Sequence, residues 1–331
     1  MNIEQTTALF NKFEAAVKLL QDALNVAPVE ALTETFDNLE TGQIKVEEGA
    51  PDQETVAKLA KLYAALDYDQ LTREQKQQVF SLLVLKALSD QEVEPNLMPT
   101  PPVIATVIAL LWRKLMGDKP ASVVDPALGT GALLVSLAQQ LASANHSQNN
   151  LTLAGLDNDE DLLALSDINF HLAGLDADLY CQDALLPWLS AKPDAIVSDL
   201  PVGYYPNDKN AENFATRRKN GHSYTHVLYI EQIIKSLKPG GFAFLVIPTS
   251  LLNGKMANDF VTWLAEKVYL QALIELPQDL FYSKLQSKEI LVFQNHGGGA
   301  KPKQVLAAKL DSLKSPASLA NFSYRLDQWA K

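Results

Sequence analysis

A short apolar run that leads through a glycine-containing turn into a helical segment constrains the fold of this chain most strongly. The segment Val-Val-Asp-Pro-Ala-Leu-Gly-Thr-Gly occupies residues 123–131. Glycine lets the backbone approach a ligand closely, and the start of a helix offers free amide donors to a carboxylate. The pattern therefore predicts a strand, a ligand-binding turn and a helix. Taken alone, it also fits a tight connection without a ligand.

Apolar runs alternate with helical segments after about residue 97, and this alternation predicts a doubly wound α/β sheet. Strands are expected at residues 122–125, 151–157, 178–182, 195–198 and 242–248. Helices are expected at residues 103–116, 132–142, 160–173, 225–237 and 255–268. A strand at 305–309 and a helix at 316–329 complete the expected elements.

The first part of the chain follows a different pattern, which indicates a mainly helical accessory module. Apolar side chains from Phe10 to Leu24 recur every three or four residues, so they lie on one face of a helix. Further helices are expected at residues 54–66 and from Thr72 onward, and a short strand at 43–47.

Prolines near residue 95 interrupt the helical pattern, so we expect one domain at residues 1–95 and a second at 96–331. The chain has a formal charge of -11, and residues 1–95 hold 17 acidic and 8 basic side chains. Because nucleic-acid affinity depends on cations that neutralise phosphates, this acidic module is a poor candidate for gripping DNA. A protein partner, or a second copy of the chain in a homo-oligomer, fits its helices better.

The composition excludes several other classes of protein. With 47% hydrophobic and 20% charged residues in 331, the chain has the composition of an ordinary globular protein. No apolar run approaches the roughly 20 residues of a membrane span, and no secretory signal opens the chain, so we expect a cytoplasmic location and no membrane partner. One cysteine and five scattered histidines indicate neither a disulfide nor a metal site.

Acidic side chains follow three successive strands of the predicted sheet. Asp125, Asp157 and Asp183 stand at the strand ends where open α/β sheets bind ligands. Asp125 can face an ammonium group, and Asp157 can accept from two ribose hydroxyls. Asp183 can accept from an adenine amino group, with Asn158 bordering the ring. S-adenosylmethionine has all of these parts, although each acid alone also fits a solvated turn or a helix cap.

A nicotinamide dehydrogenase is the competing class of enzyme, since it shares the first strand, the glycine turn and the acid after the second strand. The segment from Gly129 to Leu134 lacks the third glycine of the dinucleotide fingerprint. The turn Lys-Pro-Gly-Gly at 238–241, ahead of the apolar run at 242–248, instead resembles the late turn and strand of class I methyltransferases.

These residues resemble a known family, the methyltransferases that modify the exocyclic amino group of adenine or cytosine in DNA, including modification subunits of restriction systems. The similarity covers about residues 97–293. Residues 98–102 resemble the segment that packs over the cofactor, and 125–131 is close to the family's Asp-Pro-Ala-Cys-Gly-Thr-Gly. Within the family, the chain is most similar to the YtxK-like bacterial proteins.

The resemblance implies a Rossmann-like sheet, mostly parallel with an antiparallel final strand, and S-adenosylmethionine as the cofactor. The implied cofactor contacts are Thr100, Asp125, Pro126, Ala127, Gly129, Thr130, Gly131, Asp157, Asn158, Asp183, Ala184 and Asp199.

The segment Asp-Leu-Pro-Val at 199–202 stands where the family has Asp or Asn, then Pro-Pro, then Tyr or Phe. An adenine amino lone pair is delocalised into the ring, so methylation needs acceptors that draw its hydrogens out of conjugation. The resemblance assigns this role to the Asp199 carboxylate and the Leu200 carbonyl, with Pro201 restraining the loop. Asp199 also fits a strand-end cap.

Aromatic stacking on an extruded base is the second requirement of this chemistry, and Val202 cannot provide it. Tyr204 and Tyr205 either restore the stacking or pack in the loop. The polar stretch at 206–224, with four basic side chains, is either a mobile lid that contacts phosphate or a solvated loop. The predicted catalytic residues are Asp199, Leu200, Pro201 and Tyr204.

Two function classes follow from these patterns. The first is an S-adenosylmethionine-dependent methyltransferase that acts on an amino or amide nitrogen, with DNA favoured and a protein or small molecule as alternatives. The second is a module that binds the cofactor, has lost catalysis through the altered motif, and acts through its N-terminal helices.

Overall fold

The computed structural model of the protein describes residues 2–91, 97–145, 151–253, 257–281, 283, 286–313 and 315–329, apart from the side chains of residues 143–145 and 316. The predicted boundary at residue 95 and the expected helix start at 255 lie outside these residues. The chain forms two compact units. The first contains Met1–Pro99, Gly129–Gly131 and Asp159–Asp176, and the second contains Thr100–Leu128, Ala132–Asn158 and Ala177–Lys331.

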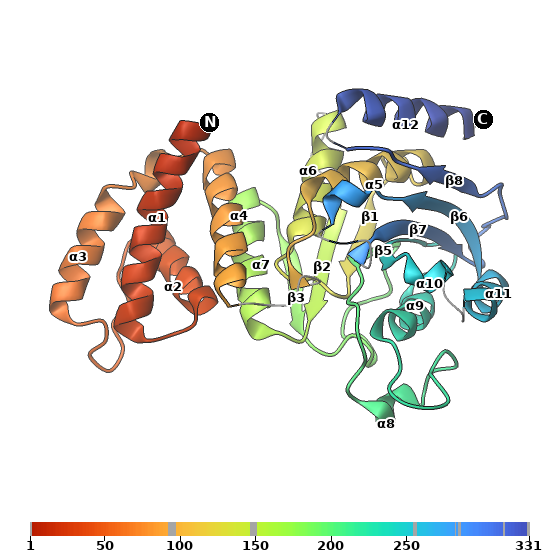
Figure 1. Ribbon diagram of the computed structural model, residues 1–331, viewed down its shortest axis with the longest axis horizontal. Helices are drawn as coiled ribbons and strands as arrows, with labels where there is room; N and C mark the ends of the chain where they lie inside the picture. Colours follow the sequence, from red (N-terminus) through yellow and green to blue (C-terminus); the bar gives the residue numbers. More distant parts are fainter. Residues whose placement is uncertain are drawn as a thin grey trace. The chain divides into compact units, whose positions relative to one another are not determined.

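The first unit is a helical bundle, coloured red to orange with one green helix in Figure 1. Capping boxes at Asn2 and Thr72 satisfy free amides at the starts of two of its helices. The 3-10 turn Tyr68–Gln70 lies ahead of the second of these helices. The helices are α1 (Ile3–Leu24), α2 (Pro28–Thr41), α3 (Gln53–Ala64), α4 (Arg73–Asp90) and α7 (Glu160–Ala173).

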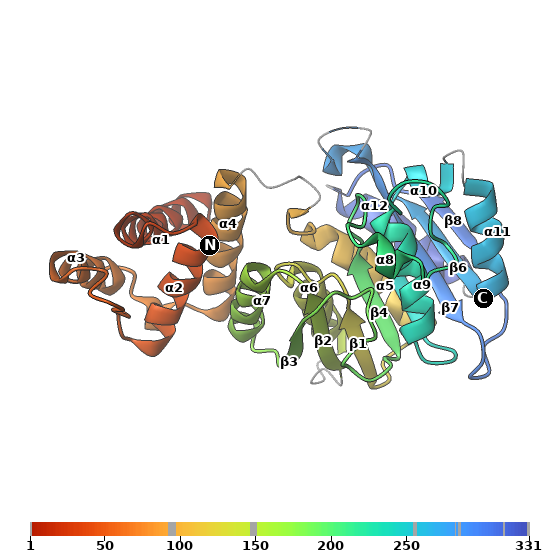
Figure 2. The same cartoon turned by 90° about the horizontal axis from the view of Figure 1, so that it is seen from below.

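Aromatic side chains form the core of this bundle. The ring of Phe36 stacks on Phe13 with 5.7 Å between centroids and meets Phe80 edge-on at 4.9 Å. Leu165 and Leu172 of α7 are buried in the same core. Helix α7 lies beside α4 in both views (Figures 1 and 2), so a helix far along the chain completes the bundle of N-terminal helices.

The prediction of a strand at residues 43–47 is wrong. The backbone groups of Glu47 and Ala50 bond to each other over 2.9 Å in both directions, as an isolated bridge. Glu48 and Gly49 between them have positive φ angles of 52° and 85°. A tight turn with one bridging pair cannot extend into a ladder, so residues 47–50 form a turn and residues 43–46 are not in a strand.

The second unit is built on an eight-stranded sheet of order β3-β2-β1-β4-β5-β7-β6-β8. Strands β1 to β5 pair in parallel, and β7 enters antiparallel between β5 and β6. The mostly parallel sheet of the prediction is confirmed. The antiparallel strand is β7, to which the sequence analysis assigned no residues, whereas the last strand of the chain, β8, pairs with β6 in parallel. The strands are β1 (Ala121–Asp125), β2 (Leu151–Asp157), β3 (Ala177–Cys181), β4 (Ala195–Asp199), β5 (Phe242–Pro248), β6 (Val268–Glu275), β7 (Lys288–Asn295) and β8 (Leu306–Lys309).

Helices cover both faces of this sheet (Figures 1 and 2). Successive residues of a strand point to opposite faces. Phe244 of β5 therefore stacks on Trp112 of one helical layer at 5.5 Å, while Leu245 joins the apolar core under the other layer. The first layer holds α5 (Pro102–Leu115), α6 (Ala132–Asn145) and α12 (Pro316–Trp329), and the second holds α9 (Thr225–Ser236) and α11 (Ala257–Lys267).

The remaining short elements are α8 (Asp208–Ala211), α10 (Ser250–Asn253) and the 3-10 turn Gln278–Leu280. Across the described residues, no helix has both the length and the apolar character needed to cross a membrane.

Candidate functional site

Four aspartates lie at the carboxyl ends of adjacent parallel strands. Asp125, Asp157 and Asp199 are the last residues of β1, β2 and β4. Asp183 follows β3 by two residues. Because the strands run in the order β3-β2-β1-β4, the structure brings the three predicted acids and Asp199 into one row along this edge of the sheet.

Asp125 is the most enclosed member of this acid row, with 1% of its surface exposed. Its Oδ1 accepts from the Ser198 hydroxyl at 2.7 Å and from the amide of Ala127 at 3.0 Å. Burial raises the pKa of Asp125 to about 7, although the two hydrogen bonds lower it. The charges of Asp157 and Asp199 add to the rise. The acids therefore lie close enough to repel one another, which favours a cation at this edge.

Tyr229 of α9 lies among the same acids, and the sequence pattern did not single it out. Burial, followed by the charges of Asp157, Asp183 and Asp125, raises the pKa of its hydroxyl. Its ring packs against a small core cluster that includes Ala184. Helical spacing assigns Tyr229 to the core, so only the acids around its hydroxyl could have marked it as a site residue.

The glycine turn joins β1 to α6. Gly129 and Gly131 have φ angles of 55° and 71°, a left-handed conformation that favours glycine. The amide of Leu128 donates to the carbonyl of Leu156 at 2.9 Å. A Cβ on Gly155 would lie 2.4 Å from the Leu128 side chain, so the leucine in the family's cysteine position packs directly on the bare backbone of β2.

The other predicted contacts differ in exposure. In the turn, Pro126 and Thr130 are buried and Ala127 is half-buried. Beyond β2 and β3, Asn158 is exposed and Ala184 is buried.

Asp183 is tied to the loop that follows the Asp-Leu-Pro-Val motif. Its Oδ1 accepts from the amide of Leu185 at 2.9 Å, and its Oδ2 accepts from the hydroxyl of Tyr205. Asn210 donates to the same hydroxyl at 2.9 Å. Tyr205 is only 5% exposed, so of its two alternatives the structure shows packing in the loop.

Asp199 is held on both carboxylate oxygens. The Thr100 hydroxyl donates to Oδ2 at 2.9 Å, and the Lys288 ammonium lies 2.6 Å from Oδ1. The amide of Leu200 donates to the carbonyl of Val246 at 3.0 Å, which fixes the start of the motif against β5. Lys288 was missed by sequence reasoning, because nothing near it in the chain connects it to Asp199.

A cavity of about 680 Å³ opens beside the end of the motif. Val202 lies on its wall, and Tyr204 stacks on Tyr224 with 5.0 Å between ring centroids. Tyr204 is 56% exposed, and the guanidinium carbon of Arg218 lies 5.9 Å from its ring centroid. The lining is aromatic and apolar to a large extent, and it includes Val202, Tyr204, Tyr224, His226, Phe260 and Trp263.

His226 is the buried polar side chain on this wall. It is 6% exposed, and its Nδ1 has no hydrogen-bond partner among the described residues. Burial lowers the pKa of His226 to about 4, so the imidazole is neutral at pH 7. A neutral imidazole offers a ligand one donor and one acceptor.

The polar stretch at residues 206–224 is anchored on α9. The two carboxylate oxygens of Glu231 accept from the amides of Ala215 at 3.1 Å and Thr216 at 2.8 Å. Phe214 is buried, whereas Arg217 is exposed. The stretch therefore has a packed apolar side and an exposed basic side, so its cations are accessible and both alternatives remain open.

A parallel sheet with the central order 3-2-1-4-5-7-6, an antiparallel β7 and a glycine turn after β1 defines a class I methyltransferase fold. A Listeria monocytogenes protein assigned to the class I S-adenosylmethionine-dependent methyltransferases has this structure, with a TM-score of 0.88, 30% identity and full coverage of both chains. YtxK of Bacillus subtilis, which is uncharacterized, is 32% identical over 100% of this chain and 99% of its own.

Residues 98–315 match the N-6 DNA methylase family, and residues 7–88 match the YtxK N-terminal helical domain. The StySPI type I restriction enzyme methylase subunit of Salmonella potsdam is 25% identical over 61% of this chain and 40% of its own length. The chain belongs to the N-6 DNA methylase family of S-adenosylmethionine-dependent methyltransferases. Both predicted resemblances are confirmed, and S-adenosylmethionine is the cofactor.

The residues at the acid edge fit that cofactor. Carboxylates suit its ribose hydroxyls, ammonium group and sulfonium, and the charges of Asp157 and Asp199 add to the burial that raises the pKa of Asp125. A Cβ built on Gly129 would meet no described atom within 4 Å, so space lies beside the turn. Within the described residues, no group of three or more His, Cys, Asp or Glu side chains is arranged to hold a metal ion.

Proposed function

We propose that this protein transfers a methyl group to an exocyclic amino nitrogen of an aromatic ring, with adenine in DNA as the favoured acceptor. The observation that carries the proposal is the position of Asp199. Its carboxylate ends β4 within the acid row, and the aromatic cavity lies against Val202 three residues later. A hydrogen-bond acceptor, a cofactor edge and an acceptor-sized cavity thus meet at one motif.

The cofactor would be held by the residues predicted from the sequence. The turn at 129–131 and Asp125 would bind its amino-acid end, Asp157 its ribose, and Asp183 with Asn158 its adenine. When bound, S-adenosylmethionine supplies an electrophilic methyl group on a sulfonium. We assign the remaining contacts to Thr100, Pro126, Ala127, Ala184 and Asp199.

Asp199 and Leu200 would prepare the acceptor nitrogen. The Asp199 carboxylate and the Leu200 carbonyl would accept its two hydrogens, which draws the lone pair out of conjugation with the ring. Pro201 restricts the loop that carries them. Holding the amine in this orientation would supply most of the rate enhancement.

Stacking would come from the cavity wall rather than from position 202. Tyr204 is exposed and stacked on Tyr224, so an inserted ring could continue the stack. Base stacking on an aromatic contributes about 1–3 kcal/mol. Tyr204 would then replace the aromatic residue that the family carries one step after Pro-Pro, and the apolar wall would exclude water.

DNA is favoured as the substrate because the chain matches the N-6 DNA methylase family and a type I methylase subunit. The exposed cations of residues 206–224 would meet the phosphates. We further propose that residues 1–95 and 96–331 act as an accessory domain and a catalytic domain, and that the accessory helices bind a protein partner or a second copy of the chain.

Asp199→Ala tests the proposal. It should lower methyl transfer by about 10²-fold or more, as expected for the loss of a positioned transition-state hydrogen bond. Cofactor affinity should change little. The assay uses labelled cofactor against DNA, RNA and lysate protein, with the exposed Asp208→Ala of α8 as a control that retains transfer. Full transfer by Asp199→Ala would refute the catalytic assignment.

The module that binds cofactor without catalysis is a second candidate, favoured by one observation. Both carboxylate oxygens of Asp199 already have partners, Thr100 and Lys288. If this pairing persists with substrate, the acceptor role is blocked. Cofactor binding without label in any of the three acceptor classes would favour this second candidate.

A further inference from the structure

Lys288 reaches Asp199 because of the way β7 is inserted into the sheet. Strand β7 runs antiparallel, so its first residue lies at the edge where the parallel strands end. Lys288 pairs with Pro248 of β5, and Asp199 pairs with Val246 on the opposite side of β5. The lysine therefore extends across the end of β5, and its Nζ lies 2.6 Å from Asp199 Oδ1.

Both members of this ion pair are largely enclosed. The side chains of Lys288 and Asp199 are 12% and 16% exposed. In the pair of Lys238 with Asp194, the corresponding values are 45% and 39%. A charge that is mostly buried is costly without its partner, so the two groups depend on each other.

The charge of Asp199 is felt inside the acid row. It contributes to the raised pKa of Asp125, so it lies within electrostatic reach of the cofactor edge. Lys288 brings an opposite charge within 2.6 Å of Asp199 Oδ1, so it offsets part of this field. The Thr100 hydroxyl holds the other carboxylate oxygen at 2.9 Å, so the carboxylate is fixed as well as partly neutralised.

We propose that Lys288 is a positioning residue that serves as the counter-charge of Asp199. It holds the carboxylate in place and cancels its charge toward the cofactor sulfonium, so that the pair acts as a neutral acceptor. A carboxylate can then occupy a position where an uncharged asparagine would also serve. The inference rests on the proposed function in placing the cofactor beside Asp199.

The test compares two probes that differ in one charge, S-adenosylmethionine with its sulfonium and S-adenosylhomocysteine with a neutral thioether. Calorimetry at pH 8 gives the affinity ratio of the two for each full-length protein. Lys288→Met should increase the affinity for S-adenosylmethionine relative to S-adenosylhomocysteine about tenfold, since no cation then balances the negative charge of Asp199. Adding Asp199→Asn to Lys288→Met should return the ratio to the wild-type value, because no charge remains.

A merely structural lysine would weaken both probes equally and leave the ratio unchanged, which would overturn the inference. A raised ratio that persists in the double variant would also overturn it, since the effect would not pass through Asp199. Lys238→Met, which breaks the more exposed pair with Asp194, is the matched control and should leave the ratio unchanged. If neither probe binds the wild type, the proposed function fails instead.

Discussion

At the scale of single residues, Glu289 shows how burial sets the ionisation of a carboxyl group. It is the second residue of β7, is 4% exposed, and its Oε1 has no hydrogen-bond partner among the described residues. Burial, followed by the charge of Glu275 across the strand pair, raises the pKa of Glu289 to about 7 from 4.5. The folded state therefore holds this proton more tightly than the unfolded chain.

We expect Glu289 to make the protein less stable as the pH rises from 4.5 to 7. Over this window the unfolded chain loses the proton that the folded state retains, so the free energy of unfolding falls and then levels off. In Glu289→Gln, the decrease in the free energy of unfolding over this window should be smaller by up to about 3 kcal/mol. Urea unfolding at pH 5 and pH 8 measures this decrease in each protein. The exposed Glu266→Gln is the control, and equal pH dependence in wild type and Glu289→Gln would contradict the expectation.

Asp157 gives a second prediction at this scale. As the last residue of β2 in the acid row, it is the proposed acceptor for the ribose hydroxyls. Asp157→Ala should weaken S-adenosylhomocysteine binding by about 1–3 kcal/mol, because ligand hydroxyls would lose a charged acceptor. Calorimetry measures the change, with the exposed Asp178→Ala on β3 as control. Unchanged affinity would remove Asp157 from the site.

At the scale of elements, the loop formed by the polar stretch at residues 206–224 depends on one buried carboxylate. Glu231 is 6% exposed, and it accepts from two loop amides while Lys235 lies 2.7 Å away. Burial would raise its pKa, but the contacts with Lys235 and with the amides lower it below the usual value. The carboxylate is thus ionised at neutral pH and holds the loop on α9.

Glu231→Gln should loosen this loop. The loss of charge-assisted bonds worth about 1.5–3 kcal/mol should increase the open population at least roughly tenfold. Trypsin cleavage after Arg217, Arg218 or Lys219, followed by mass spectrometry, measures the opening. The exposed Glu212→Gln on the same loop should cleave at the wild-type rate. A cleavage rate unaffected by Glu231→Gln would show that other contacts fix the loop.

The sequence predicted the elements that are marked by neighbouring residues, such as an apolar run between two turns. The strands ending in Asp125, Asp157 and Asp199 have short buried runs and flanking turns, and all are present. Strand β6 was missed because it starts at Val268, directly after α11 ends at Lys267, so no turn separates the two patterns. The role of Lys288 could not be predicted, since it depends on the antiparallel insertion of β7.

At the scale of the whole molecule, the two compact units do not follow the order of the chain. Helix α7 lies between β2 and β3 in sequence, yet it packs on α2 and α4 in the first unit. Leu165, Ile168 and Leu172 are buried in that core. A helix between two strands was expected from its spacing, but spacing carries no information on which core it completes.

A fragment that starts at residue 97 should therefore be less stable than the full chain. Removal of α1 to α4 would expose Leu165, Ile168 and Leu172, and each buried apolar side chain contributes about 1.5–3 kcal/mol. A loss on the order of 5 kcal/mol is expected, measured as a lower thermal midpoint with increased binding of a hydrophobic dye. A fragment with the midpoint of the full chain would show that α7 is stable without the N-terminal helices.

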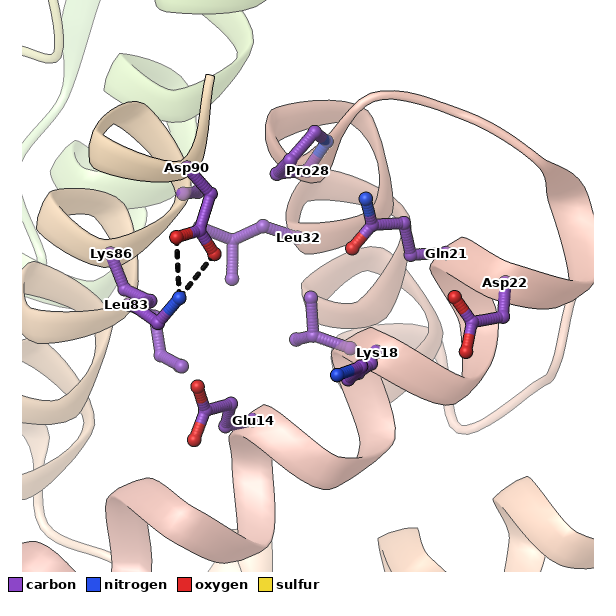
Figure 3. Close-up of a pocket in the computed structure, with 11 residues that line it drawn as sticks. Glu14, Lys18, Gln21, Asp22, Pro28, Leu32, Leu83, Lys86 and Asp90 are labelled. Carbon is purple, nitrogen blue, oxygen red and sulfur yellow. Dashed lines mark hydrogen bonds and ion pairs between the residues drawn. The ribbon is translucent and has the colours of Figure 1, made fainter. Parts of the chain in front are cut away.

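The N-terminal helices α1, α2 and α4 also differ in surface charge from the loop at residues 206–224. Figure 3 shows a pocket of about 260 Å³ among α1, α2 and α4, where Glu14, Asp22 and Asp90 accompany Lys18 and Lys86. The ammonium of Lys86 is already paired with Asp90, as the dashed lines mark. Such a mixed surface with an acidic excess does not favour phosphate.

Binding of a DNA duplex by the full chain should therefore depend on the loop cations and not on the accessory helices. Arg217→Ala with Lys219→Ala should weaken the affinity and reduce the slope of log K against log salt by about two, roughly one for each lost phosphate contact. Lys18→Ala with Lys61→Ala removes two exposed cations from the first unit and is the matched control, expected to leave affinity and slope unchanged. Fluorescence anisotropy between about 50 and 200 mM salt measures both slopes.

A slope that falls only in the Lys18 and Lys61 variant would transfer the DNA contact to the accessory helices. Equal slopes in all three proteins would mean that neither set of cations meets phosphate, and the proposed role of the loop would be wrong.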